Sequence, residues 1–174
     1  MKDTIKFGIG FVTGRPNVCK IINSTYERLI NQFNNLDKKV ELTAYILFDL
    51  GYQYTTRIDF YGIIPNVYKD LSIRYITPED IEEEKKRLIG REEFSKADVD
   101  LFFGHGHAKG RNSLMYYAVR DKMDYLLFWD DDEYPVACMK DETTNEVIWK
   151  EQDNIAMHLK YIKNADVTIG YHCG

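Results

Sequence analysis

The first 48 residues carry a strand–helix–strand pattern that restricts the fold more than any other feature of the sequence. Residues 5–12 and 40–48 are apolar runs, typical of strands that are buried on both faces. Between them, residues 18–34 place apolar side chains along one stripe at helical spacing, after a turn at residues 13–17. The short links between these segments favour a βαβ unit, with parallel strands and a right-handed crossover.

A later apolar run ends in a cluster of carboxylates. Residues 125–129 are apolar or aromatic, which indicates another buried strand. The residues that follow it are Asp130, Asp131, Asp132 and Glu133. Adjacent carboxylates repel one another, and a hard divalent ion such as Mg²⁺ or Mn²⁺ would relieve that repulsion. The simpler alternative is a solvated acidic turn, but the basic segment upstream favours a metal and phosphate site.

The ends of the first two strands are also polar. Ligands of open α/β sheets bind beyond the carboxyl ends of the strands. Thr13 and Arg15 follow the first strand, where Arg15 suits a phosphate or a stacked base and Thr13 either contacts the ligand or caps the turn. Asp49 ends the second strand, where it can accept a hydrogen bond from a base or ribose, or form an Asx turn before Gly51.

Residues 104–112 form a glycine-rich loop that leads into a helix. Backbone N–H groups at a helix start, together with Lys109 and Arg111, favour a phosphate, whereas the alternative is a tight turn with two solvated cations. His105 and His107 have the spacing of a metal pair. Because no third ligand is close in sequence, we interpret them as loop residues, one of which could contact a substrate phosphate.

The remaining elements follow from apolar spacing and from residues that start helices. Thr77 and Pro78 predict the start of a helix that runs to about residue 89. Because domains seldom end directly after a core strand, we expect a single domain, residues 1–174, that is truncated at its C-terminus. Further expected elements are helices at residues 95–103, 111–123 and 155–163 (the last capped by Asp153), strands at residues 58–64 and 71–76 in a hairpin, a hairpin of residues 136–139 with 146–149, and a final strand at residues 167–171.

Composition and charge narrow the class of protein. The chain has 44% hydrophobic and 29% charged residues, ordinary values for a soluble globular protein. Its net charge of −5 argues against non-specific nucleic-acid binding. The three cysteines form no Cys-x-x-Cys pair, and no apolar run approaches the roughly 20 residues that span a bilayer. We therefore expect a cytoplasmic protein with reduced thiols, and leave peripheral attachment to a membrane open.

The order of these motifs resembles a GT-A glycosyltransferase of the large family 2 of nucleotide-sugar transferases. The resemblance rests on Lys109-Gly110-Arg111-Asn112 at a helix, followed by the hydrophobic strand and Asp130-Asp131-Asp132. These are similar to the family's Gly-x-Arg-Asn helix and Asp-x-Asp motif. The resemblance implies an α/β GT-A fold, a Rossmann-like three-layer sandwich with a mostly parallel central sheet. It also implies transfer of a sugar from a nucleoside-diphosphate sugar donor to a hydroxyl of an acceptor glycan or other compound.

The same resemblance implies roles for single residues. Asp132 would bind Mn²⁺ or Mg²⁺, Asp130 would approach the ribose or the metal shell, and Asp131 would support both. No general base is assigned, because the family's acceptor half and catalytic base follow the strand that ends this chain. The nucleotide sugar would be contacted at its base and ribose by Thr13, Arg15 and Asp49, and at its diphosphate by Lys109, Arg111 and Asn112.

Two departures from the family pattern keep other functions open. Residues 48–52 retain only one Asp and the Gly of the family's motif, and residues 52–103 form a longer segment than family members usually need. One alternative is a non-catalytic fragment that binds nucleotide sugars. Another is a sugar-phosphate nucleotidylyltransferase, although residues 10–16 match its glycine-rich first loop poorly. A haloacid-dehalogenase-like phosphatase fits less well, because its nucleophile lies near the N-terminus.

Overall fold

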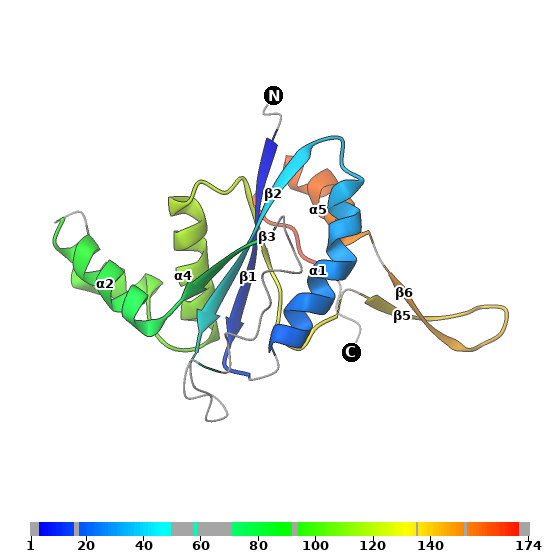
Figure 1. Ribbon diagram of the computed structural model, residues 1–174, viewed down its shortest axis with the longest axis horizontal. Coiled ribbons are helices and arrows are strands. Elements are labelled where there is room, and N and C mark those ends of the chain that lie inside the picture. Colours follow the sequence, from blue (N-terminus) through cyan, green and yellow to red (C-terminus); the bar gives the residue numbers. More distant parts are fainter. Residues whose placement is uncertain are drawn as a thin grey trace.

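A four-stranded parallel sheet forms the centre of the protein (Figure 1). The computed structural model describes residues 4–15, 18–49, 58, 71–91, 94–134, 136–151 and 153–170. All strand pairings in this sheet are parallel, so the strands end at the same edge, which we call the carboxyl edge. In spatial order the strands are β3 (Leu71–Ile76), β2 (Lys39–Phe48), β1 (Thr4–Thr13) and β4 (Tyr125–Phe128).

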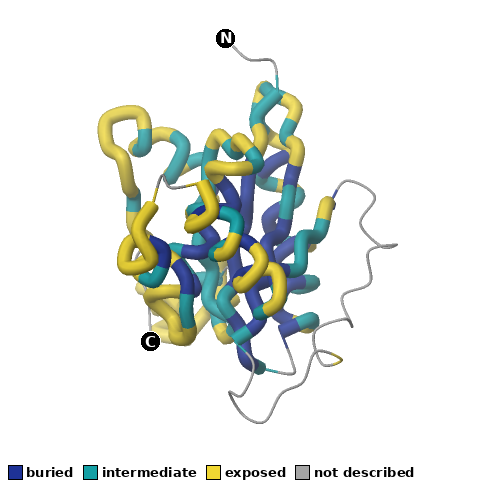
Figure 2. Tube along the Cα trace, turned by 90° about the vertical axis from the view of Figure 1, so that its left-hand side faces the viewer, coloured by how far each residue is buried: buried dark blue, intermediate teal, exposed yellow. Residues whose placement is uncertain are grey.

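Helices cover both faces of the sheet and complete a three-layer arrangement (Figure 1). Helices α1 (Val18–Asn34) and α5 (Asn154–Tyr161) pack on one face. Helices α2 (Pro78–Ile89) and α4 (His107–Arg120) pack on the other, with α3 (Lys96–Phe102) beside them. Strands β1 and β2 are the most deeply buried part of the sheet (Figure 2), whereas β4 at its edge is only half-buried, which corrects the expectation of a buried strand at residues 125–129. The predicted α/β class with a parallel sheet is therefore confirmed, and the architecture is compatible with a Rossmann-like sandwich.

Alternation along β2 shows how the sequence makes two cores. Leu42, Ala44 and Ile46 point to the α1 face, whereas Tyr45 and Leu47 point to the α2 and α4 face. A strand that is apolar on both faces has to be covered twice, as the unbroken apolar run predicts. The expected helical stripe of α1 is also confirmed, and its buried members include Val18, Ile21, Ile22, Leu29 and Phe33.

Two helix starts occur where capping residues predict them. The Thr77 hydroxyl accepts a hydrogen bond from the Asp80 N–H, and the Asp80 carboxylate accepts one from the Thr77 N–H, which forms a reciprocal capping box before Pro78. At α5, the Asp153 carboxylate accepts from the Ala156 N–H at 3.2 Å. Helix α5 is joined to α1 by a hydrogen bond from the Ile155 N–H to Gln32 Oε1.

Helix α4 begins four residues earlier than the expected start at residue 111, because Gly106 makes the preceding turn. The backbone of Gly106 has a φ of +92°, a conformation that residues other than glycine rarely adopt. Leu114, Tyr117 and Ala118 face the core. Met115 of the same helix is exposed.

The predicted hairpin after the acidic residues is confirmed. Strands β5 (Val136–Lys140) and β6 (Val147–Glu151) pair antiparallel and project from the sandwich (Figure 1). Every residue of β6 is exposed, including Trp149. This ribbon therefore adds little to the two cores.

Two further expectations concern strands. Residues 71–76 form a strand as predicted and pair parallel with β2, whereas the expected hairpin partner, residues 58–64, lies outside the described residues except for Ile58. Residues 167–170 are not a strand, which corrects the prediction for residues 167–171. Val167 and Ile169 are exposed there, so these apolar side chains are not part of a core.

Among the helices that the structure describes, none is long and apolar enough to cross a membrane.

Candidate functional site

Three polar strand ends meet at the carboxyl edge. Strand β1 lies between β2 and β4, so Thr13 at the end of β1 is close to the residues that follow both neighbours. The Asp49 N–H donates to the Thr13 carbonyl oxygen at 2.8 Å, and the Trp129 N–H donates to the Gly10 carbonyl oxygen at 3.0 Å. These backbone contacts hold the first residues after β2 and β4 beside the end of β1. We call Asp130, Asp131 and Asp132 the acidic cluster. Thr13, Arg15 and Arg111 contact it.

The acidic residues themselves form a closed turn. The Glu133 N–H donates to the Asp130 carbonyl oxygen at 3.3 Å, and the Trp129 indole N–H donates to the Glu133 carbonyl oxygen at 3.0 Å. This turn spreads the three aspartate side chains into different surroundings. The exposed fractions of the side chains are 34% for Asp130, 13% for Asp131 and 53% for Asp132. Asp132 is therefore the carboxylate with most room for a ligand.

Asp131 is the least exposed of the three aspartates and anchors this turn. The hydroxyl of Thr13, a residue that is 1% exposed, donates to Asp131 Oδ2 at 2.7 Å. The same hydroxyl accepts from the Arg15 N–H at 3.2 Å, so its donor and one acceptor site are both used. This arrangement joins residues 118 positions apart in sequence. It assigns Thr13 a structural contact with Asp131 in addition to any contact with a ligand.

Arg15 bridges two of the aspartates. Its guanidinium Nε lies 3.4 Å from Asp131 Oδ1, and its NH1 lies 2.7 Å from Asp132 Oδ2. Guanidinium groups form strong charge-assisted hydrogen bonds with carboxylates and with phosphates. Arg15 therefore offsets the repulsion between carboxylates that the sequence suggested a metal ion would relieve.

A second arginine reaches the cluster from α4. Arg111 NH2 lies 2.7 Å from Asp130 Oδ1, and its guanidinium carbon lies 5.6 Å from the centre of the Phe128 ring. His107 Nε2 lies 3.7 Å from the same Asp130 oxygen. His107 and Arg111 share one face because they are four residues apart on a helix. That spacing is the sequence signal for His107, which the interpretation as a loop residue missed.

Gly110 sets the distance between α4 and the sheet. A Cβ atom at this position would lie 2.6 Å from Val12 Cγ1 and 2.8 Å from Val12 Cγ2, closer than side chains pack. Only glycine lets the first turn of α4 rest directly on β1. The close approach also brings the next residue, Arg111, to the end of β4.

Other predicted ligands lie apart from the acidic residues. The Asn112 side-chain amide donates to the Leu101 carbonyl oxygen of α3 at 3.1 Å. Lys109 lies along the loop at Gly104, where its Cδ occupies the space of a Cβ atom, and its charge acts on Asp100 of α3. These two residues therefore face α3. Asp49 is half-buried at the end of β2, next to Thr13.

The donor set can hold a divalent ion only with help from a ligand. Within residues that the structure describes, no three His, Cys, Asp or Glu side chains gather closely enough to form a complete metal site. Mg²⁺ commonly binds to one or two carboxylates, with substrate phosphates and waters as the other ligands. Asp130 and the half-exposed Asp132 fit that incomplete type of site. A metal ion there would compete with Arg15 for Asp132.

Comparisons with known proteins do not assign this site. No protein-family model matches the chain, and searches of curated proteins and of solved structures found no match.

Proposed function

We propose that the carboxyl edge binds the diphosphate of a nucleoside-diphosphate sugar, and that the chain is the donor-binding part of a metal-dependent glycosyltransferase. The observation that carries the proposal is the convergence of Arg15, Arg111 and three aspartates on one strand end. The side chains of Arg15 and Arg111 are 34% and 39% exposed, so an incoming phosphate can reach them. Such a set suits a metal-bound diphosphate, because carboxylates bind the metal ion and arginines bind the phosphates.

Charge balance explains why a metal ion would favour binding. Two guanidinium groups face three carboxylates, which leaves one excess negative charge when His107 is neutral. A diphosphate alone would be repelled by that excess. Asp130 and Asp132 would hold a divalent ion, which would make the net charge of the site positive and would supply neutralisation of the charge on a departing diphosphate.

The residues of this chain then have separate tasks. Asp132 and Asp130 hold the cation, and Asp131 keeps the turn in place through Thr13. Arg15, released from Asp132, and Arg111 donate hydrogen bonds to phosphate oxygens. Asp49 accepts from the ribose or base at the end of β2. An acceptor hydroxyl would attack the anomeric carbon as the bond to the diphosphate breaks, and its proton would pass to a base that we do not assign.

Hydrolysis of the donor is the first test. UDP-glucose, UDP-N-acetylglucosamine and GDP-mannose are incubated with the protein and Mn²⁺, and release of UDP or GDP is measured. We expect slow release with at least one donor, loss of release when the metal is chelated, and loss in Asp132→Asn. Asp37→Asn, which changes an exposed aspartate outside the cluster, is the matched control. Release that persists in Asp132→Asn would refute the proposed role of this residue.

The Arg15–Asp132 ion pair also favours a second function. With Arg15 serving as the cation of the cluster, the chain would bind a nucleotide sugar without metal and without turnover. In that case nucleoside diphosphates would raise the midpoint of thermal unfolding equally with and without Mn²⁺, because a ligand stabilises the state that it binds. The metal-dependent proposal instead predicts a larger rise with Mn²⁺.

A further inference from the structure

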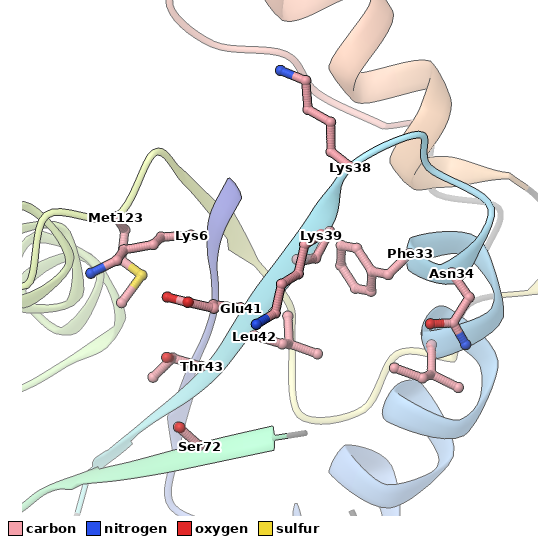
Figure 3. Close-up of a pocket in the computed structure, with 12 residues that line it drawn as sticks. Lys6, Phe33, Asn34, Lys38, Lys39, Glu41, Leu42, Thr43, Ser72 and Met123 are labelled. Carbon is pink, nitrogen blue, oxygen red and sulfur yellow. The ribbon is translucent and has the colours of Figure 1, made fainter. Parts of the chain in front are cut away.

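A cavity lies at the opposite, amino edge of the sheet (Figure 3). Its volume is about 610 Å³, which is in the range of small-molecule sites. The strands contribute residues near their N-terminal ends to this cavity, whereas the acidic cluster follows the last residues of β1 and β4. The two sites are thus separated by the length of the sheet.

The cavity lies beside the first residues of β2, near the first described residue of β3. Leu71, the first residue of β3, pairs with Leu42 of β2. The preceding residues of β2, 39–41, therefore extend past the beginning of β3. The cavity opens around this projecting end of β2 and reaches side chains on both faces of the sheet.

The two faces give the cavity a polar side and an apolar side. Lys6 pairs with Glu41, and Thr43 pairs with Ser72, so these four side chains share one face. The apolar residues Ile30, Phe33, Val40 and Leu42 belong to the core on the α1 face and line the cavity from there. Figure 3 shows Glu41 and Thr43 on one side of β2 and Phe33 and Leu42 on the other. A ligand that fills the cavity needs both a polar and an apolar part.

Charge favours an anion at the polar side. The cavity is lined by Lys6, Lys38 and Lys39, with Glu41 as the one carboxylate among the described lining residues. Lys38 extends away from the others in Figure 3, which leaves Lys6 and Lys39 nearest to the strands. In the described part of the chain, no carboxylate forms an ion pair with either ammonium group. This positive surface stands out in a chain whose net charge is −5.

We propose that this cavity binds an amphipathic anion, a small molecule that joins an alkyl or aryl body to a phosphate, sulfonate or carboxylate. The anionic group lies between Lys6 and Lys39 and accepts hydrogen bonds from the hydroxyls of Thr43 and Ser72. The apolar body lies against the partly exposed Ile30 and Val40, beside the buried Phe33 and Leu42. This inference does not depend on nucleotide binding at the carboxyl edge.

Octyl phosphate is a suitable probe because it carries both parts. Amide chemical shifts of the ¹⁵N-labelled chain are followed during titrations with octyl phosphate, inorganic phosphate and octanol. We expect saturable shifts at Val40, Leu42 and Ser72 with octyl phosphate, and at least roughly tenfold weaker binding of the other two compounds. Equal affinity for inorganic phosphate or for octanol would overturn the amphipathic class. Shifts centred on Trp149 of the exposed hairpin would overturn the location.

Two variants test the cavity from different directions. Lys6→Ala/Lys39→Ala removes the anion partners and should weaken octyl phosphate roughly threefold to tenfold without changing octanol. Ser72→Trp fills the cavity from an exposed position and should abolish saturable binding. The matched control is Lys20→Ala/Lys86→Ala, two exposed helix lysines away from the cavity, which should bind as the unaltered chain does. Equal losses in the control pair would show non-specific electrostatics and refute the site.

Discussion

The contact of Gly110 with Val12 can be tested by adding one methyl group. Gly110→Ala places a Cβ atom 2.6 Å from Val12 Cγ1, whereas carbon atoms in contact are about 3.5–4.0 Å apart. Either Val12 or the first turn of α4 then has to move by about 1 Å. Forced overpacking of this kind costs about 1–3 kcal/mol, while alanine in place of glycine inside a helix returns about 1 kcal/mol. The expected net effect is a decrease of about 0–2 kcal/mol in the free energy of unfolding.

A double-mutant cycle separates the two contributions. Val12→Ala removes the two methyl groups closest to the new Cβ atom and leaves the Cβ atom of residue 12 at 3.3 Å from it, so in that background Gly110→Ala should range from neutral to stabilising by about 1 kcal/mol. The free energy of unfolding is measured by urea denaturation of the four proteins, with circular dichroism as the signal. If Gly110→Ala stabilises the chain by the same amount in both backgrounds, helix propensity alone acts, and the close approach of α4 to β1 is wrong.

The remaining predictions concern stability. Glu84 is buried, and its pKa is held below the ordinary value of about 4.3 chiefly by hydrogen bonds from Arg87, with Tyr116 contributing. Because a lowered pKa stabilises the fold above the unfolded-state pKa, that contribution should disappear as pH falls below about 4.3; the thermal midpoint of Glu84→Gln should change less over this range. Ile155 is fully buried where α5 meets α1, so Ile155→Ala should lower the free energy of unfolding by about 2–5 kcal/mol in urea, and a loss below 0.5 kcal/mol would contradict the docking of α5. Asp153→Ala removes the N-cap of α5 and should cost about 0.5–2 kcal/mol, with Asp166→Ala as an exposed control that should cost little.

The fold is predictable where one short segment carries its own signal. The structure contains the apolar stripe of α1, the apolar runs of β1 and β2, and the start of α2 at Thr77 and Pro78. Each of these is recognised from a periodic pattern or a capping residue within the segment itself. The start of α4 is different. Gly106 and Gly110 have the composition of a loop, but in the structure Gly106 makes the turn before the helix, and Gly110 lets the first turn of the helix approach Val12, about one hundred residues earlier in the chain. The prediction of a strand at residues 167–171 is wrong for a related reason. A strand needs a neighbouring strand to pair with, and apolar composition does not show whether one is present.

The candidate site is predictable in outline and not in its contacts. Parallel topology alone places the ends of β1, β2 and β4 together, since β1 lies between the other two. Local sequence cannot show that Thr13 donates to Asp131, that Arg15 pairs with Asp132, or that Asn112 turns to α3. The carboxylate repulsion that suggested a cation is real, but two arginines from distant segments already offset part of it.

Calorimetric titration of UDP and GDP, with and without Mn²⁺, tests the central proposal most directly. The unaltered chain should bind at least one of them more tightly with Mn²⁺. Asp132→Asn should lose this difference, a weakening of roughly tenfold to a hundredfold, because it removes a charged ligand of the ion. Asp37→Asn should keep the difference. If affinity is the same with and without Mn²⁺, and Asp132→Asn binds as well or better because Arg15 is released, the metal–diphosphate account of the acidic cluster is wrong.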